Sequence, residues 1–164
     1  MTTVAEVREV LAQVTDPEIP VITIEDLGIL RDVTMDGTTI TVTITPTYSG
    51  CPAMDEIRAD ISTALAAHGW DDVVVKLVLS PAWTTDWMSA DGRRKLEEYG
   101  IAPPRRTRSG PVAVSLSSRE RTGLTCPQCG SRDTEELSRF ASTACKSMWR
   151  CKACREPFDH FKDH

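Results

Sequence analysis

The sequence predicts an α+β protein: a small αββαβ-type domain with helices on one face of its sheet, followed by a small cysteine-rich module. Three observations support this prediction. Apolar residues recur at helical spacing near the start of the 164-residue chain, and a stretch in which apolar residues alternate with threonine follows. Near the end, four of the six cysteines form two C-x-x-C pairs.

The first three elements are a helix and a strand pair. Val4, Val7, Leu11 and Val14 share one helical face, so a helix is expected over residues 3–14, before the Asp16-Pro17 dipeptide. Strands are expected over 27–35 and 38–46. Asp36-Gly37 between them is a strong hairpin signal. The alternation in the second strand predicts one buried and one wetter face.

A helix, a strand and a second helix complete the domain. The first of these helices is expected from about residue 52 to residue 67, ended by Gly69. Residues 73–79 are almost entirely apolar and therefore predict a central strand. Ser89 to Tyr99 predicts a short helix closed by Gly100.

Charge and composition indicate two modules. Residues 1–104 carry 7 basic and 17 acidic side chains, whereas residues 105–164 carry 12 and 7. We expect a domain over 1–104, a linker over 105–122 that includes a short strand around 112–116, and a module over 123–164. No apolar run is long enough for a membrane helix and no secretory signal is evident, so the expected compartment is the cytoplasm.

The two C-x-x-C pairs predict one tetrahedral metal site with Cys126, Cys129, Cys151 and Cys154 as ligands. The pairs are separated by 21 residues, and Gly130 suits the tight turn after the first pair. Zinc is the expected metal and the module is expected to be zinc-ribbon-like. Three alternatives stay open: two free dithiols, an iron–sulfur cluster, and a ligand set that includes Cys145.

Cys51 is a candidate functional thiol because Pro52 follows it at the predicted start of a helix. Proline is common at the first position of a helix, so Cys51 is expected at the N-cap. The positive end of the helix lowers the pKa of a thiol at that position. The alternative is a small buried residue that fills the helix start.

Two further clusters each allow two interpretations. Asp16 and Glu18 are paired carboxylates that suit a cation, although Asp-Pro-Glu at a helix end also forms a solvated turn. Trp83 and Trp87 lie in a loop after the third strand. They are either partner contacts or a cap on the core of a small sheet.

Several motifs resemble known iron–sulfur assembly proteins. Asp16-Pro17-Glu18-Ile19-Pro20, Asp26-Leu27-Gly28-Ile29 and the run Thr45-Pro46-Thr47-Tyr48-Ser49-Gly50-Cys51-Pro52 resemble the SufT-like and MIP18-like domain. With the run from Pro81 to Trp87, the segment Gly100-Ile101-Ala102-Pro103-Pro104 and the C-terminal cysteines, nearly the whole chain resembles the PaaD family.

The resemblance implies an accessory role in phenylacetate catabolism. The protein would serve the multicomponent phenylacetyl-CoA epoxidase, which epoxidises the aromatic ring of the CoA thioester. It implies that the protein assists iron–sulfur cluster or metal insertion and is not catalytic by itself. The expected client is the iron–sulfur reductase component. Cys51 is then the functional thiol, with Asp16, Glu18 and Thr47 as motif neighbours. A homodimer that pairs two Cys51 thiols is one way to hold a cluster.

Three other functions are each suggested by a part of the sequence. A structural subunit of the oxygenase complex would use the tryptophan loop and the basic tail as contacts. A zinc-ribbon nucleic-acid binder is suggested by Arg105, Arg106, Arg108, Arg119 and Arg121, but the acidic first domain argues against it. A thiol–disulfide oxidoreductase would need a C-x-x-C pair on a thioredoxin-like frame, and neither pair has one.

Overall fold

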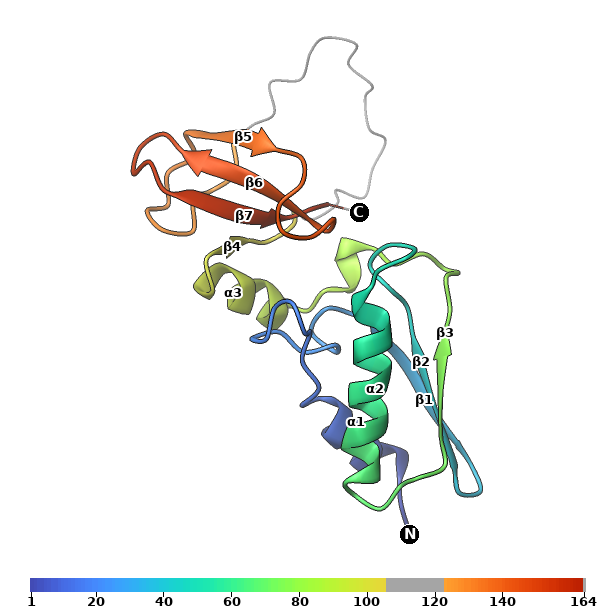
Figure 1. Cartoon of the computed structure of the whole chain (residues 1–164). Helices are drawn as coiled ribbons and strands as arrows, with labels where there is room; N and C mark the ends of the chain where they lie inside the picture. Colours follow the sequence, from blue (N-terminus) through green and yellow to red (C-terminus); the bar gives the residue numbers. More distant parts are fainter. Residues whose placement is uncertain (106–122, 164) are drawn as a thin grey trace. The chain divides into compact units, whose positions relative to one another are not determined.

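The computed structural model describes residues 1–105 and 123–163, which divide into two compact units (Figure 1). The first is Met1–Lys95 and the second Leu96–His164, so the division falls inside a helix rather than after residue 104. The predicted linker, Arg105 apart, and the strand around 112–116 lie outside the described residues. Within the described ranges, no helix combines the length and apolar character needed to cross a membrane.

The first unit begins with helix α1 (Val4–Leu11), which starts at a capping box. The Thr3 hydroxyl accepts a bond from the Glu6 backbone N–H, and the Glu6 carboxylate accepts one from the Thr3 N–H. The helix is shorter than predicted. Its apolar spacing continues to Val14, but residues 14–16 instead pair through backbone hydrogen bonds with residues 22–24.

The sheet of this unit has the order β1-β2-β3. Strands β1 (Leu30–Asp36) and β2 (Thr39–Ile44) form the predicted hairpin around Gly37, whose φ is 60°. Helix α2 (Ala53–Ala66) then leads to β3 (Val73–Leu77), which runs parallel to β2. The prediction of a central third strand was wrong. The hairpin occupies one side of β2, so β3 joins the other side and lies at the edge, where Val74 and Leu77 are exposed.

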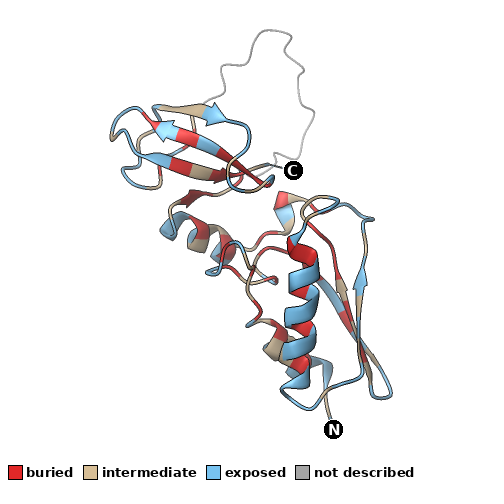
Figure 2. Cartoon of the chain, in the orientation of Figure 1, coloured by how far each residue is buried: buried red, intermediate tan, exposed pale blue. Residues whose placement is uncertain are grey.

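The core of the first unit lies between the sheet and its helices. The inward residues of β2 (Ile40, Val42 and Ile44) are buried, as is the α2 stripe of Ile57, Ile61 and Leu65. Figure 2 shows that α2 is red along one side and pale blue along the other. The αββαβ order with helices on one face of the sheet confirms the predicted fold class.

A turn and a helix follow β3. The 3-10 turn η1 (Thr85–Trp87) precedes helix α3 (Ala90–Glu98). The Asp26 carboxylate accepts bonds from the Ser89 hydroxyl at 2.9 Å and from the Lys95 ammonium at 2.7 Å. These bonds hold the start of α3 to the segment that precedes β1.

The second unit contains a four-stranded sheet of order β4-β7-β6-β5. Its strands are β4 (Ile101–Ala102), β5 (Thr134–Ser138), β6 (Lys146–Cys151) and β7 (Pro157–Phe161). β4 is parallel to β7, and the other neighbours are antiparallel. Its buried core cluster is small, and two cysteines belong to it: Ala102, Leu124, Cys126, Trp149, Cys151 and Phe158.

Candidate metal centre and candidate thiol site

Two turns of the same design present the C-terminal cysteines. The N–H of Cys126 donates to the carbonyl of Ser131, five residues on, and the N–H of Cys151 donates to that of Glu156, at the same offset. Each turn has a left-handed residue directly after its second cysteine. Gly130 has φ 75°, and Arg155, which has a side chain, has φ 67°. The backbones of the two turns therefore match, and each presents a pair of thiols.

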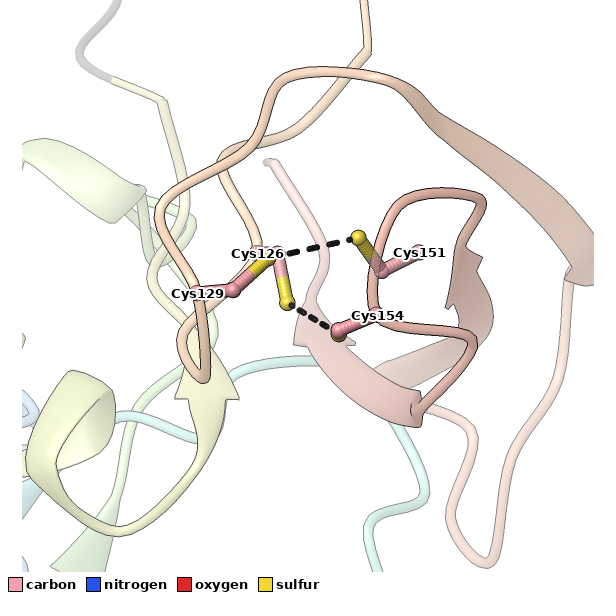
Figure 3. Close-up of side chains that lie close together, drawn as sticks. All are labelled: Cys126, Cys129, Cys151 and Cys154. Atoms are coloured by element: carbon pink, nitrogen blue, oxygen red, sulfur yellow. Dashed lines mark hydrogen bonds between the residues drawn. The ribbon is translucent and has the colours of Figure 1, made fainter.

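The four thiols converge on one point (Figure 3). The Sγ atoms of Cys126 and Cys154 are 3.8 Å apart, those of Cys129 and Cys151 are 3.6 Å apart, and all four sulfurs lie within 4.8 Å of one another. A tetrahedral site with Zn–S bonds of about 2.3 Å has sulfur–sulfur edges of about 3.8 Å. A cluster places several iron and sulfide atoms between its thiolates, which need wider separations. The geometry therefore fits one mononuclear ion.

Backbone N–H groups donate to two of these sulfurs, those of Cys151 and Cys154. The N–H groups of Cys154 and then of Ala153 donate to the Cys151 sulfur and lower the pKa of this thiol to about 6. The N–H of Glu156 donates to the sulfur of Cys154, but burial and the neighbouring thiols of Cys129, Cys151 and Cys126 raise the pKa of Cys154 to about 12. A metal ligand must be a thiolate, and backbone donors stabilise that form.

Cys145 lies outside this group, which is the one group of potential ligands found among the described residues. Its side chain is buried, and its Sγ atom lies 3.1 Å from the Thr143 hydroxyl. The alternative ligand set that includes Cys145 therefore does not match the structure.

Cys51 lies one residue outside the helix cap. The N-cap of α2 is Pro52, with φ −67° and ψ −22°, so the prediction of Cys51 at this position was wrong by one residue. A proline there leaves the Ala53 N–H as the first free donor, and this group donates to the Cys51 sulfur. The helix start therefore still faces the thiol.

The predicted lowering of the Cys51 pKa was also wrong. Burial raises the pKa of this half-buried thiol above its usual range. The Ala53 N–H and the Tyr48 hydroxyl act in the opposite direction, but the carboxylates of Glu18 and Asp16 add to the rise. Cys51 is therefore mainly a neutral thiol at neutral pH.

The carboxylates near Cys51 have different surroundings. Asp16 is buried, and its Oδ1 atom accepts bonds from the backbone N–H groups of Glu18 at 2.8 Å and Ile19 at 2.9 Å. Asp16 thus closes a tight turn and is not the solvated residue that one interpretation expected, whereas the Glu18 side chain is exposed. Thr47 is partly buried in the loop before Cys51.

The two loop tryptophans also differ. Trp83 is buried, and its indole N–H donates to the Leu27 carbonyl at 2.8 Å, which favours the core interpretation over a partner contact. Trp87 is partly exposed beneath the guanidinium of Arg31, which lies 3.5 Å from the ring centroid. A partner contact through Trp87 stays a prediction.

Sequence reasoning missed two residues of these sites. Tyr48 donates to Cys51 although it lies three positions earlier, on the far side of Gly50, which has φ 82°. That glycine was the available signal for a reversal of the chain. Arg155 was missed because its residue type does not indicate a left-handed conformation.

Comparison with known proteins assigns a class to each part of the chain. Residues 4–77 match the model of the iron–sulfur cluster assembly protein family, and residues 111–162 match the PaaD zinc beta ribbon domain. A putative 1,2-phenylacetyl-CoA epoxidase subunit of Escherichia coli is 47% identical to the chain, over 97% of this chain and 92% of that protein. The chain belongs to the PaaD family.

Other relatives match only the first part. The Fe-S protein maturation auxiliary factor of Porphyromonas gingivalis is 36% identical over 58% of this chain and 92% of its own length. A DUF59 domain from Bacillus anthracis superimposes with a TM-score of 0.53 at 29% identity, covering 57% of this chain and 90% of that one. The Thermotoga maritima protein TM0487 gives 0.50 at 30% identity, with 58% and 94% covered.

Proposed function

We propose that this protein is a maturation factor for a phenylacetyl-CoA epoxidase of aerobic phenylacetate degradation, and that it helps to insert iron–sulfur clusters or metal into an oxygenase or reductase component. The observation that carries the proposal is the half-buried thiol of Cys51 at the start of α2, in a unit related to Fe-S maturation factors. The Escherichia coli relative, whose name places it in the epoxidase, supports the choice of client. Cytoplasmic localisation remains the expectation.

Cys51 would act as a transient ligand. Among the described residues it belongs to no group of metal-ligating side chains, so one chain offers a cluster a single thiolate there. On binding iron the thiol would release its proton, and on transfer to the cysteines of the client it would take a proton back. A raised thiol pKa favours this second step, because it makes the protonated thiol the stable product.

The second unit would hold one structural zinc ion through Cys126, Cys129, Cys151 and Cys154. The sulfur separations and the two matching turns support this assignment over a cluster. Such an ion stabilises the fold of a small module and does no chemistry there, since four protein ligands leave no open position.

Insertion of a cluster into the apo form of the iron–sulfur reductase component tests the role of Cys51. The full chain is loaded without oxygen, mixed with the apo reductase, and the reductase spectrum is followed. Cys51→Ala is expected to remove transfer, whereas Cys145→Ser, which changes a cysteine outside both sites, retains it. Full restoration of oxygenase activity by Cys51→Ala in a strain lacking this gene would contradict the proposal.

Metal and sulfide content, measured on protein purified without oxygen, tests the second site. One zinc per chain, with no acid-labile sulfide and no colour, is expected after Cys51→Ala as well as before it. Iron with matching sulfide that persists in Cys51→Ala would assign a cluster to the C-terminal cysteines instead.

A structural subunit that stays in the oxygenase complex is the second candidate. The name of the Escherichia coli relative, which calls that protein a subunit of the epoxidase, favours it. Stable stoichiometric co-purification with the other components, together with unchanged activity of Cys51→Ala, would select this function.

A further inference from the structure

Three apolar side chains of the second unit lie near one another in its sheet and are all exposed to solvent. Leu137, Phe140 and Met148, named here the ribbon patch, are 49%, 65% and 38% exposed. In contrast, Ser147 and Trp149, which flank Met148 on β6, are buried. Met148 therefore points away from the core of the unit.

The register of β5 and β6 brings the ribbon patch together. Ser138 pairs with Met148, and the register shifts between Glu136 and Ser138, so Leu137 is the extra residue of a bulge beside this pair. The chain stays close after Phe140, because the Ala141 N–H donates to the Lys146 carbonyl at 3.0 Å. The bulge also makes pairing of another strand along β5 unfavourable, so a ligand would contact the face of the sheet.

Two basic side chains border the ribbon patch. The Lys162 Nζ atom lies 4.1 Å from the centroid of the Phe140 ring, and Arg139 precedes Phe140 in the chain. Glu135 is paired with Arg150, and Asp159 with Lys146 at 3.5 Å. Within the part of the chain that the structure describes, Arg139 and Lys162 have no carboxylate within salt-bridge distance.

We propose that the ribbon patch docks an acidic protein surface with an apolar centre, on another component of the phenylacetyl-CoA epoxidase. Apolar anchors bordered by cations that have no carboxylate partner among the described residues complement such a surface. Nucleic acid fits less well, because Lys162 already occupies one face of the exposed Phe140 ring and two cations make no phosphate track. The inference rests on the proposed place of this protein beside the epoxidase and does not depend on Cys51.

Binding of the full zinc-loaded chain to each purified component of the epoxidase, by biolayer interferometry at low and high salt, tests the docking surface. Phe140→Ala and Arg139→Glu are each expected to raise Kd at least about tenfold for one component. Added salt should weaken that complex. Two matched controls should leave Kd unchanged. Tyr99→Ala removes an exposed aromatic side chain elsewhere in the second unit, and Arg58→Glu reverses an exposed charge on α2. Zinc content verifies that each variant is folded.

Several results would overturn the docking surface. One is that the patch variants bind the component as tightly as the controls do. Another is that the unmodified chain binds no component of the epoxidase. A third is that only the patch variants lose self-association, RNA binding or binding to anionic vesicles, which would assign the ribbon patch to a different ligand. Cluster insertion by Cys51 is measured separately with the Cys51→Ala variant. Failure of docking with intact transfer would therefore contradict only this inference.

Discussion

At the scale of single residues, Cys51 shows how neighbours decide the chemistry of a thiol. Burial and two carboxylates raise its pKa, so its thiolate fraction at a given pH is below that of a free cysteine. We expect alkylation of Cys51 by iodoacetamide to be slow at neutral pH and to accelerate as pH rises, with a midpoint above the ordinary thiol pKa. Mass spectrometry of the Cys51 peptide measures this rate.

Glu18→Gln should shift this profile to lower pH, because it removes an exposed carboxylate that disfavours the thiolate. Glu25→Gln, which changes another exposed carboxylate of the same unit, serves as the control and leaves the profile unchanged. A profile with its midpoint below the ordinary thiol value in the unmodified chain would show that the helix start dominates after all.

Gly130 and Arg155 occupy the same place in the two cysteine turns, which gives a second prediction. A Cβ atom at Gly130 would meet nothing within 4 Å, so Gly130→Ala should cost only the left-handed conformation, about 1 kcal/mol of unfolding free energy. Arg155→Gly relieves that cost in the other turn and should not lower stability. Thermal unfolding of the zinc-loaded variants compares them, and equal losses would contradict the proposed equivalence of the turns.

At the scale of elements, local signals were sufficient for most of the fold. Asp36-Gly37 predicted the β1–β2 hairpin, and the two C-x-x-C pairs predicted that their four thiols converge, because a turn or a chelating pair is encoded within a few residues. The edge position of β3 was not predictable from its apolar composition. It depends on which side of β2 the hairpin leaves open, and similarly the pKa of Cys51 depends on burial by distant segments.

The segment before β1 packs tightly against the turn after β3, which gives a third prediction. Gly28 has φ 75°, and a Cβ atom there would lie 2.6 Å from the Trp87 carbonyl oxygen and 2.7 Å from the Trp87 Cβ atom. Gly28→Ala should therefore destabilise the first unit by about 2–4 kcal/mol, through overpacking and the left-handed conformation together. Urea unfolding followed by tryptophan fluorescence measures the loss.

Gly37→Ala is the matched control for this substitution. Gly37 is also left-handed, with φ 60°, but a Cβ atom there would meet nothing within 4 Å. Its expected cost is about 1 kcal/mol. Equal costs at the two positions would mean that the segment before β1 moves away from Trp87 and that the close approach is not required.

At the scale of the whole molecule, the two units are stabilised in different ways. The first has a core of many buried aliphatic side chains, whereas the core cluster of the second comprises six of the described residues, two of which are proposed metal ligands. The two family matches, over 4–77 and 111–162, follow the same division. Such a small core stabilises a module poorly without a bound ion.

Removal of the metal should therefore unfold the second unit alone. Binding of a structural zinc ion supplies roughly 10 kcal/mol or more, and this free energy is also folding free energy. After chelation we expect β5, β6 and β7 to lose protection from hydrogen exchange while α2 and β2 keep theirs. Cys151→Ser should match the chelated protein, and Cys145→Ser, which changes no proposed ligand, should match the loaded one.

Loss of protection in both units together would show that they fold as one cooperative body, and unchanged protection in both would show that the ion does not stabilise the sheet. Either result would contradict the division of stability between an aliphatic core and a metal-centred one.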